Sequence, residues 1–148
     1  MVSLNHYRHK TPAVLLPLPL TFVAVIPILP PRKKEAIPQL LASSDIALIP
    51  LKTYIPGAVP SKIYEAMASA RPLILVAEGE AATIVNETDA GIVISPGDTI
   101  AIAQGIRRLF SDNELRQRLG ANGRSAALKR FNRKEIIGNL LQFLKEHL

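Results

Sequence analysis

The stretch VPSKIYEAMASARPLILVAEGEAATIV, residues 59–85, predicts a helix, a strand and a second helix in direct succession. The apolar residues of its first part recur with the i, i+3, i+4, i+7 spacing of one helix face: Ile63, Ala66, Met67 and Ala70. PLILVA follows as a short apolar run without polar alternation, which is typical of a strand buried on both faces. EAATIVNET then predicts a short helix that begins near Gly79. This order indicates an α/β protein with a parallel sheet.

Further strands are predicted on both sides of this stretch. Upstream, Phe22–Leu29 and Ile46–Leu51 are apolar runs rich in β-branched residues. Downstream, GIVIS predicts a fourth strand, and Asp98 or Thr99 can cap the helix after it. We therefore expect an α/β fold: a partial Rossmann-like parallel sheet of about four strands with flanking helices and a helical C-terminal tail, residues 112–148.

The composition excludes several classes of site. The chain has 148 residues, which suits one domain, and with 48% hydrophobic but only 5% aromatic residues its core must be aliphatic. It contains no cysteine, which excludes a disulfide scaffold, a thiolate metal site and a cysteine nucleophile. The histidines, His6, His9 and His147, have no second cluster of ligands beside them, so no metal is expected.

The N-terminal residues resemble a signal peptide in composition, because a polar, basic segment precedes an apolar one. The apolar segment is interrupted by prolines that a helix would not tolerate, and no small-residue cleavage site follows it. We therefore expect residues 1–20 to be an irregular leader, ordered or disordered, and residues 21–148 to be the folded but incomplete domain. The first strand–helix units of a complete doubly wound domain are not found in the sequence.

The net charge of +6 is unevenly distributed. Residues 78–98 contain five acids and no Lys or Arg, whereas residues 99–148 contain ten Lys or Arg and four acids. A basic C-terminal third could favour phosphates, anionic lipid or nucleic acid. Solvated helix faces are the simpler and favoured explanation, and nucleic-acid binding is not expected because no aromatic residues are interleaved with the basic ones.

Two strand-to-helix junctions can carry a ligand site, since ligands of open α/β sheets bind at the carboxyl ends of the strands. At the first, the helix starts at Pro60, whose missing N–H costs nothing if it is the first helical residue. The amides of Ser61 and Lys62 then lack intrahelical partners and could bind a phosphate, with the Lys62 ammonium adding charge. Glu65 could accept hydrogen bonds from a ribose diol, or it could merely complement the helix dipole.

The second junction is AEGEAA, residues 77–82, where a strand ends and a helix begins at about Gly79. Its free amides could meet the other end of the same ligand, and Glu78 and Glu80 could accept hydrogen bonds from sugar hydroxyls. Ordinary helix-start chemistry accounts for the same residues, so this alternative stays open.

Four segments in order carry a family resemblance: LLASSDIALIPL, VPSKIYEAMASARPLILV, GEAATIVNETDAGIVISPGD and LFSDNELRQRLGANGRSAALKRFNRKEII. From about Phe22 to its end, the chain resembles the C-terminal, donor-binding half of a GT-B glycosyltransferase of family 4, also called group 1. The segment PSKIYE is similar to the corresponding segment of family members that build surface polysaccharides. The resemblance implies a Rossmann-like domain that binds a nucleotide-sugar.

The resemblance also implies roles for individual residues. Glu65 matches the second glutamate of the family's Glu-x7-Glu motif, which holds the nucleotide ribose, but the first glutamate of that motif falls on Gly57. Ala70 stands where the family usually has glycine, and no catalytic residue is assigned. The candidates for donor nucleotide and phosphate binding are Gly57, Ala58, Val59, Ser61, Lys62 and Glu65, and those for sugar contacts are Gly79 and Glu80.

The expected function is therefore that of the donor-binding domain of a retaining, hexosyl-transferring glycosyltransferase. Its donor would be a UDP- or GDP-sugar and its acceptor a glycan or lipid-linked glycan, with no cofactor and no metal. The acceptor domain is not found, so little or no turnover is expected without a partner subunit or self-association through an exposed sheet face. The expected location is the cytoplasm, including the inner membrane surface. The alternative is a non-catalytic interaction or membrane-docking module on the same scaffold.

Overall fold

The computed structural model describes residues 30–51 and 55–147. The leader, residues 1–20, and the strand predicted at Phe22–Leu29 lie outside the described residues. The chain divides into two units, residues 1–36 and 37–148. In the first unit the described part contains one short 3-10 helix, Lys34–Ala36.

The second unit is built on three parallel strands in the order β1-β2-β3. They are β1 (Ala47–Pro50), β2 (Leu73–Val76) and β3 (Gly91–Ile94). Ala47 lies opposite Leu73, and Leu73 lies opposite Gly91. The α/β class and the parallel sheet are thus confirmed, with three strands within the described residues. The helices are α1 (Ile37–Ala42), α2 (Ser61–Ala68), α3 (Glu80–Glu87), α4 (Thr99–Ser111), α5 (Asn113–Lys129) and α6 (Arg133–His147).

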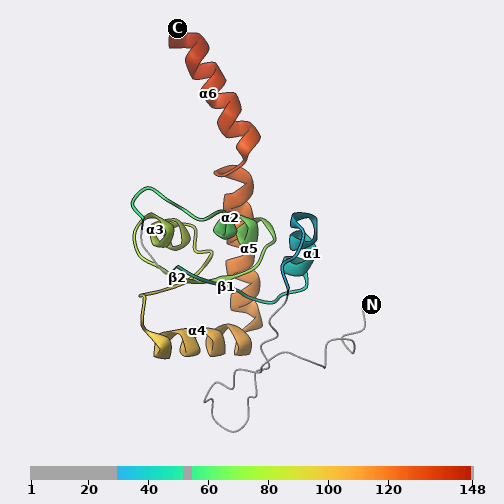
Figure 1. The fold of residues 1–148 in the computed structure, drawn as a ribbon, viewed down its shortest axis with the longest axis vertical. Helices are drawn as coiled ribbons and strands as arrows, with labels where there is room; N and C mark the ends of the chain where they lie inside the picture. Colours follow the sequence, from blue (N-terminus) through green and yellow to red (C-terminus); the bar gives the residue numbers. More distant parts are fainter. Residues whose placement is uncertain (1–29, 52–54, 148) are drawn as a thin grey trace. The chain divides into compact units, whose positions relative to one another are not determined.

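Helices cover both faces of the sheet (Figure 1), with α2 and α3 on one side and α4 on the other. All four residues of β2 are buried, as expected for a strand between two layers. Its odd-numbered residues join a core cluster with α2 and α3, and its even-numbered residues join one with α4 and α5. The first cluster includes Ile63, Met67, Leu73, Leu75 and Val85, and the second includes Ile74, Val76, Leu109, Leu115 and Leu119.

The helical C-terminal region is confirmed, but α5 is more than a tail because it packs into the core. Asp112 begins this helix by accepting a hydrogen bond from the Leu115 amide at 2.8 Å, which is an ordinary side-chain N-cap. Leu115 is 9% and Leu119 2% exposed. Further along, a Cβ added at Gly123 would lie 3.3–3.4 Å from atoms of Ala90 and Met67. α5 therefore supports α2 directly.

The end of α2 places an alanine in a backbone conformation that favours glycine. Ala70 has a φ of +54°. The Ala70 amide donates to the Met67 carbonyl and the Arg71 amide to the Ala66 carbonyl, both at 3.0 Å. This pair of bonds is a Schellman motif, in which the left-handed position is usually glycine. The family's preference for glycine at this position thus has a local steric reason.

Replacing Ala70 by glycine is expected to stabilise the chain by about 1 kcal/mol, because the left-handed conformation strains a residue with a Cβ. Urea unfolding of Ala70→Gly beside the wild type measures the change. An unchanged or lower free energy of unfolding would show that the gain is offset, either by backbone entropy or by lost packing.

Gly120 is where α5 approaches the end of α2 most closely. A Cβ added there would overlap the carbonyl oxygen of Ala70, which is backbone and cannot move aside cheaply. We expect Gly120→Ala to destabilise the chain by about 2 kcal/mol through this overlap. The matched control is Gly138→Ala in α6, where nothing lies within 4 Å of the added Cβ, and it should leave the free energy of unfolding unchanged or slightly raised. Equal effects of the two substitutions would contradict the packing described here.

Candidate functional site

The two junctions predicted as ligand sites lie at the same edge of the sheet. α2 follows the carboxyl end of β1, and α3 follows the carboxyl end of β2, its parallel neighbour. Pro60 has φ −63° and ψ 135°, so it is the extended N-cap of α2 and the helix begins at Ser61. The expectation that Pro60 is the first helical residue was therefore wrong by one position, because its ψ is not helical. The amides of Ser61 and Lys62 belong to the first turn, where no intrahelical acceptor exists.

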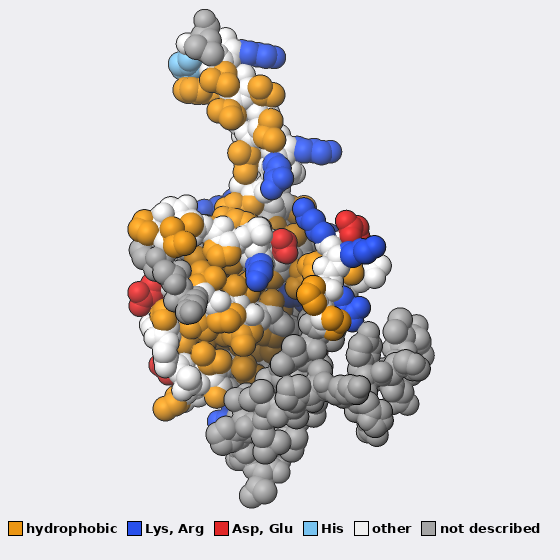
Figure 2. All heavy atoms as spheres, in the orientation of Figure 1, with side chains coloured by type: hydrophobic (Ala, Val, Ile, Leu, Met, Phe, Trp, Pro, Cys, Tyr) orange, Lys and Arg blue, Asp and Glu red, His pale blue; other side chains and the backbone are white. Residues whose placement is uncertain are grey.

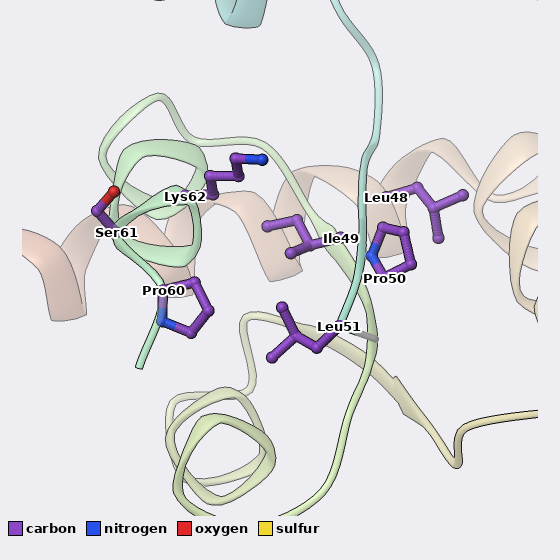
Figure 3. A pocket seen from close by; sticks show the side chains of 7 residues that line it. All are labelled: Leu48, Ile49, Pro50, Leu51, Pro60, Ser61 and Lys62. Carbon is purple, nitrogen blue, oxygen red and sulfur yellow. The ribbon is translucent and has the colours of Figure 1, made fainter. Parts of the chain in front are cut away.

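A pocket of about 350 Å³ lies between β1 and the start of α2 (Figure 3). In this view the side chains of Ile49, in β1, and Leu51, directly after it, point toward the start of α2. The wall is thus apolar, and Ser61 and Lys62 add a hydroxyl and an ammonium. The lining residues are Leu48, Ile49, Pro50, Leu51, Pro60, Ser61 and Lys62.

The β1 wall of this pocket was not among the predicted site residues. A signal for it existed in the sequence, since IALIPL is the apolar strand that leads into the candidate loop. Leu48 is 47% exposed although it lies in a strand, so β1 presents an apolar face. Within the described residues, β1 has a hydrogen-bonded neighbour on one side, β2.

Glu65 lies on the first turns of α2 and is exposed. The Ser61 hydroxyl donates a hydrogen bond to Glu65 Oε1 at 3.2 Å, which brings two predicted site residues together. Glu65 is not among the residues that line the pocket, so it stands beside the pocket on the same helix end. Its carboxylate keeps acceptor capacity, because an ionised carboxylate has about four lone-pair sites.

The loop before α2 contains a tight turn at Ile55–Ala58. The Ala58 amide donates to the Ile55 carbonyl at 3.1 Å, and Gly57 has a φ of +75°. A type II turn needs a positive φ at its third position, which glycine provides, and proline is common at its second position. The amide of Ala58, a predicted binding residue, is thus used within the turn, and Val59, another, packs against the core.

The second junction is bonded to the first. Gly79, with φ 70° and ψ −148°, is the N-cap of α3, and its carbonyl accepts from the Thr83 amide at 3.0 Å. Glu80 Oε1 accepts a hydrogen bond from the Gly57 amide at 3.2 Å. Glu80 was expected to contact a sugar, and in this structure its carboxylate links α3 to the turn before α2. This contact between residues distant in sequence unites the two predicted places into one site.

The charged side chains of the candidate site, those of Lys62, Glu65 and Glu80, lie in contact with solvent. Ser61, Lys62, Glu65, Gly79 and Glu80 are all exposed. Within residues 30–51 and 55–147, no group of three or more His, Asp or Glu residues is arranged to hold a metal ion.

Tyr64, next to Glu65 in sequence, has a structural role. Its ring lies 4.9 Å from that of Phe131, between centroids, and burial raises the pKa of the Tyr64 hydroxyl above its usual range. Tyr64 is therefore neutral at neutral pH, and it anchors α2 to the end of α5.

The bond between Glu80 and Gly57 predicts a local effect of substitution. Glu80→Ala removes the acceptor, so the Gly57 amide should exchange with solvent several-fold faster. Glu80→Gln keeps a carbonyl oxygen in the same place and should preserve most of the protection. Hydrogen exchange followed by NMR measures both rates, and equal rates in the two variants would argue against the bond.

A family model supports the resemblance seen in the sequence. The model described as "Glycosyl transferases group 1" matches residues 25–126, more than half of the chain. The N-acetyl-alpha-D-glucosaminyl L-malate synthase of Bacillus anthracis is 29% identical over 105 residues, which cover 71% of this chain and 27% of that protein. The lipopolysaccharide core biosynthesis glycosyltransferase LpsD of Rhizobium meliloti (strain 1021) is 36% identical over 74 residues, or 49% of this chain and 21% of LpsD.

Solved structures show the same fold. A sucrose-phosphate synthase from Thermosynechococcus elongatus matches with a TM-score of 0.61 and 28% identity, covering 74% of this chain and 27% of its own. WaaG, a glycosyltransferase involved in lipopolysaccharide biosynthesis, matches with a TM-score of 0.56 over 62% of this chain and 24% of its own, and at 22% identity it supports the fold alone. The chain spans about a quarter of the length of these proteins. On the family match and the parallel α/β architecture, the chain belongs to the group 1 glycosyltransferases.

Proposed function

We propose that the start of α2 and the pocket beside it bind the nucleotide diphosphate of a nucleotide-sugar donor, of the UDP or GDP type. The observation that carries this proposal is the convergence of helix-start amides, the Lys62 ammonium and a pocket at the carboxyl end of β1. Free amides and the positive end of the helix dipole favour phosphate groups. The membership in the glycosyltransferase family supports the same ligand.

Each candidate residue has a distinct role in this proposal. The amides of Ser61 and Lys62 donate to the phosphate oxygens, and the Lys62 side chain offsets their charge. Glu65 accepts hydrogen bonds from the ribose hydroxyls, with Ser61 holding its carboxylate in place at 3.2 Å. Gly79 and Glu80, at the start of α3, stand on the side where the sugar would extend. No catalytic residue is assigned.

The activity of the whole enzyme is proposed from its relatives. We infer a retaining transfer of a hexosyl group to a glycan or a lipid-linked glycan. This reaction needs a closed cleft that excludes water and stabilises the departing diphosphate. Since the chain spans about a quarter of its relatives, the other wall of that cleft would come from a polypeptide equivalent to their remaining length. By itself the chain would bind the donor with little or no turnover.

The proposed location is the cytoplasm, at the inner surface of the membrane, where lipid-linked acceptors are accessible. Among the described residues, no helix combines the length and apolar character that a membrane span requires.

Calorimetric titration with UDP, GDP and ADP, with and without an attached sugar, tests the donor site. We expect one nucleotide to bind, even if only at about millimolar strength, or roughly −4 kcal/mol. Glu65→Ala should weaken binding about tenfold, because a diol hydrogen-bonded to a charged group contributes about 1.5 kcal/mol. Lys62→Ala should weaken nucleotide binding, and the loss of affinity should be largest at low salt. At high salt, the attraction between the Lys62 ammonium and the phosphates is already screened in the wild type.

The matched control is Glu146→Ala, which removes an exposed acid on α6 and should leave nucleotide affinity unchanged. Circular dichroism of each variant establishes that it is folded. A folded wild-type chain that binds none of the nucleotides would contradict a functional donor site in this chain and favour the docking-module alternative.

A further inference from the structure

The turn that precedes α2 is not held in place by burial. Its four residues, Ile55, Pro56, Gly57 and Ala58, are all exposed. A Cβ added at Gly57 would have nothing within 4 Å, so the space around this position is open. Val59, two positions before α2 begins, packs against the core. The turn itself therefore depends on polar contacts to keep one position.

A carboxylate from another helix supplies such a contact. Glu80 Oε1 accepts a hydrogen bond from the Gly57 amide at 3.2 Å, across 23 positions of sequence. The Ala58 amide donates to the Ile55 carbonyl at 3.1 Å and so closes the turn from within. Because this internal bond does not use the Gly57 amide, the contact with Glu80 ties the closed turn as a unit to the start of α3.

The direction of α3 explains why the Glu80 side chain reaches the turn. Glu80 is the first residue of the helix and follows the N-cap, Gly79. Side chains of a helix tilt toward its N-terminus, and the N-terminus of α3 lies at the carboxyl end of β2. Since β1 is the parallel neighbour of β2, the loop that leaves β1 emerges at the same edge of the sheet.

The turn is close in sequence to the amides of the proposed donor site. Between Gly57 and Ser61 the chain passes through Pro60, whose ring restricts its φ, −63° here. Pro60, Ser61 and Lys62 also line the pocket beside β1. A short, stiff connection transmits movement, so a displaced turn changes how the chain enters the first turn of α2.

We propose that Glu80 is a positioning residue for the donor diphosphate. It holds the turn at Gly57 so that the chain enters α2 with the Ser61 and Lys62 amides facing the phosphates. Glu80 acts through the turn and not through contact with the sugar. This inference rests on the donor site proposed above, and it names a residue that supports the site without touching the ligand.

The charge of Glu80 makes this role testable by the sign of the effect. A carboxylate near a diphosphate repels it, so the removal of an acid that only contributes charge should strengthen nucleotide binding. On the face of the molecule that Figure 2 shows, acidic side chains stand singly and not in a patch. Replacing one acid therefore changes the local charge by a single unit. Weaker binding after loss of Glu80 would run against its charge and would point to its hydrogen bond.

Calorimetric titration of Glu80 variants with UDP and GDP, each with and without an attached sugar, tests the positioning role. Glu80→Ala removes the charge and the acceptor, and it should weaken binding about fivefold, because an unheld turn must be ordered when the donor binds. Glu80→Gln removes the charge but keeps a carbonyl oxygen for the Gly57 amide, so it should bind as the wild type does or more tightly. The loss in Glu80→Ala should be equal for bare nucleotides and nucleotide-sugars, because the positioned amides face the phosphates.

The matched control is Glu114→Ala at the start of α5. Glu80 and Glu114 are both exposed acids in the first turn of a helix, so either substitution removes a similar attraction between an acid and the helix dipole. Glu114→Ala should leave nucleotide affinity unchanged. Because both side chains are exposed, all the variants should keep the folded core, and unfolding curves check this.

The outcomes distinguish this role from the donor site itself. If the wild type binds a nucleotide and Glu80→Ala binds it equally well or more tightly, the positioning role is wrong and the donor site stands. A loss confined to nucleotide-sugars would show that Glu80 contacts the sugar, and an equal loss in Glu80→Gln would trace the effect to charge. Either result overturns the positioning role. A folded wild-type chain that binds no nucleotide overturns the donor site and this role with it.

Discussion

The structure depends on the parallel pairing of β2 between β1 and β3. β2 is buried on both faces, with Leu73 and Leu75 against α2 and α3 and with Ile74 and Val76 against α4 and α5. Because neighbouring strands run in the same direction, the loops that leave β1 and β2 emerge at one edge. The starts of α2 and α3 therefore meet there, and the candidate site is a consequence of the strand order rather than of any one motif.

The direction of α2 is fixed by contacts at its far end. The carbonyl of Ala70 lies against Gly120 of α5, and Gly123 of α5 lies against Met67. The Tyr64 ring packs at a tilt against that of Phe131, beyond the end of α5. These contacts pack α2 against α5, and the first-turn amides at Ser61 and Lys62 belong to this packed helix. A site built on such a supported helix end needs little rearrangement to accept an anion.

The site is open to solvent, and this sets what it can do. Water and salt weaken the attraction of an exposed charge such as that of Lys62, so it would contribute modestly to the proposed binding of a diphosphate. Catalysis of glycosyl transfer gains most from preorganised charges in a water-excluded cleft. In the proposed function this arrangement supplies one wall of such a cleft, and the hydrogen bond of Glu80 joins the turn at Gly57 to the start of α3.

The sequence by itself determined the secondary structure elements and the family. Helical spacing in residues 61–68 and the apolar run at 73–76 are local patterns, and the order of the motifs indicated a group 1 glycosyltransferase domain, which the family match confirmed. Tertiary structure decided which of these residues meet. The bond between Glu80 and Gly57 joins positions far apart in the chain, the β1 wall of the pocket depends on where α2 begins, and α5 is part of the core because Gly120 and Gly123 allow close approach. Sequence patterns record the periodicity of each element, whereas contacts between elements depend on their packing in space.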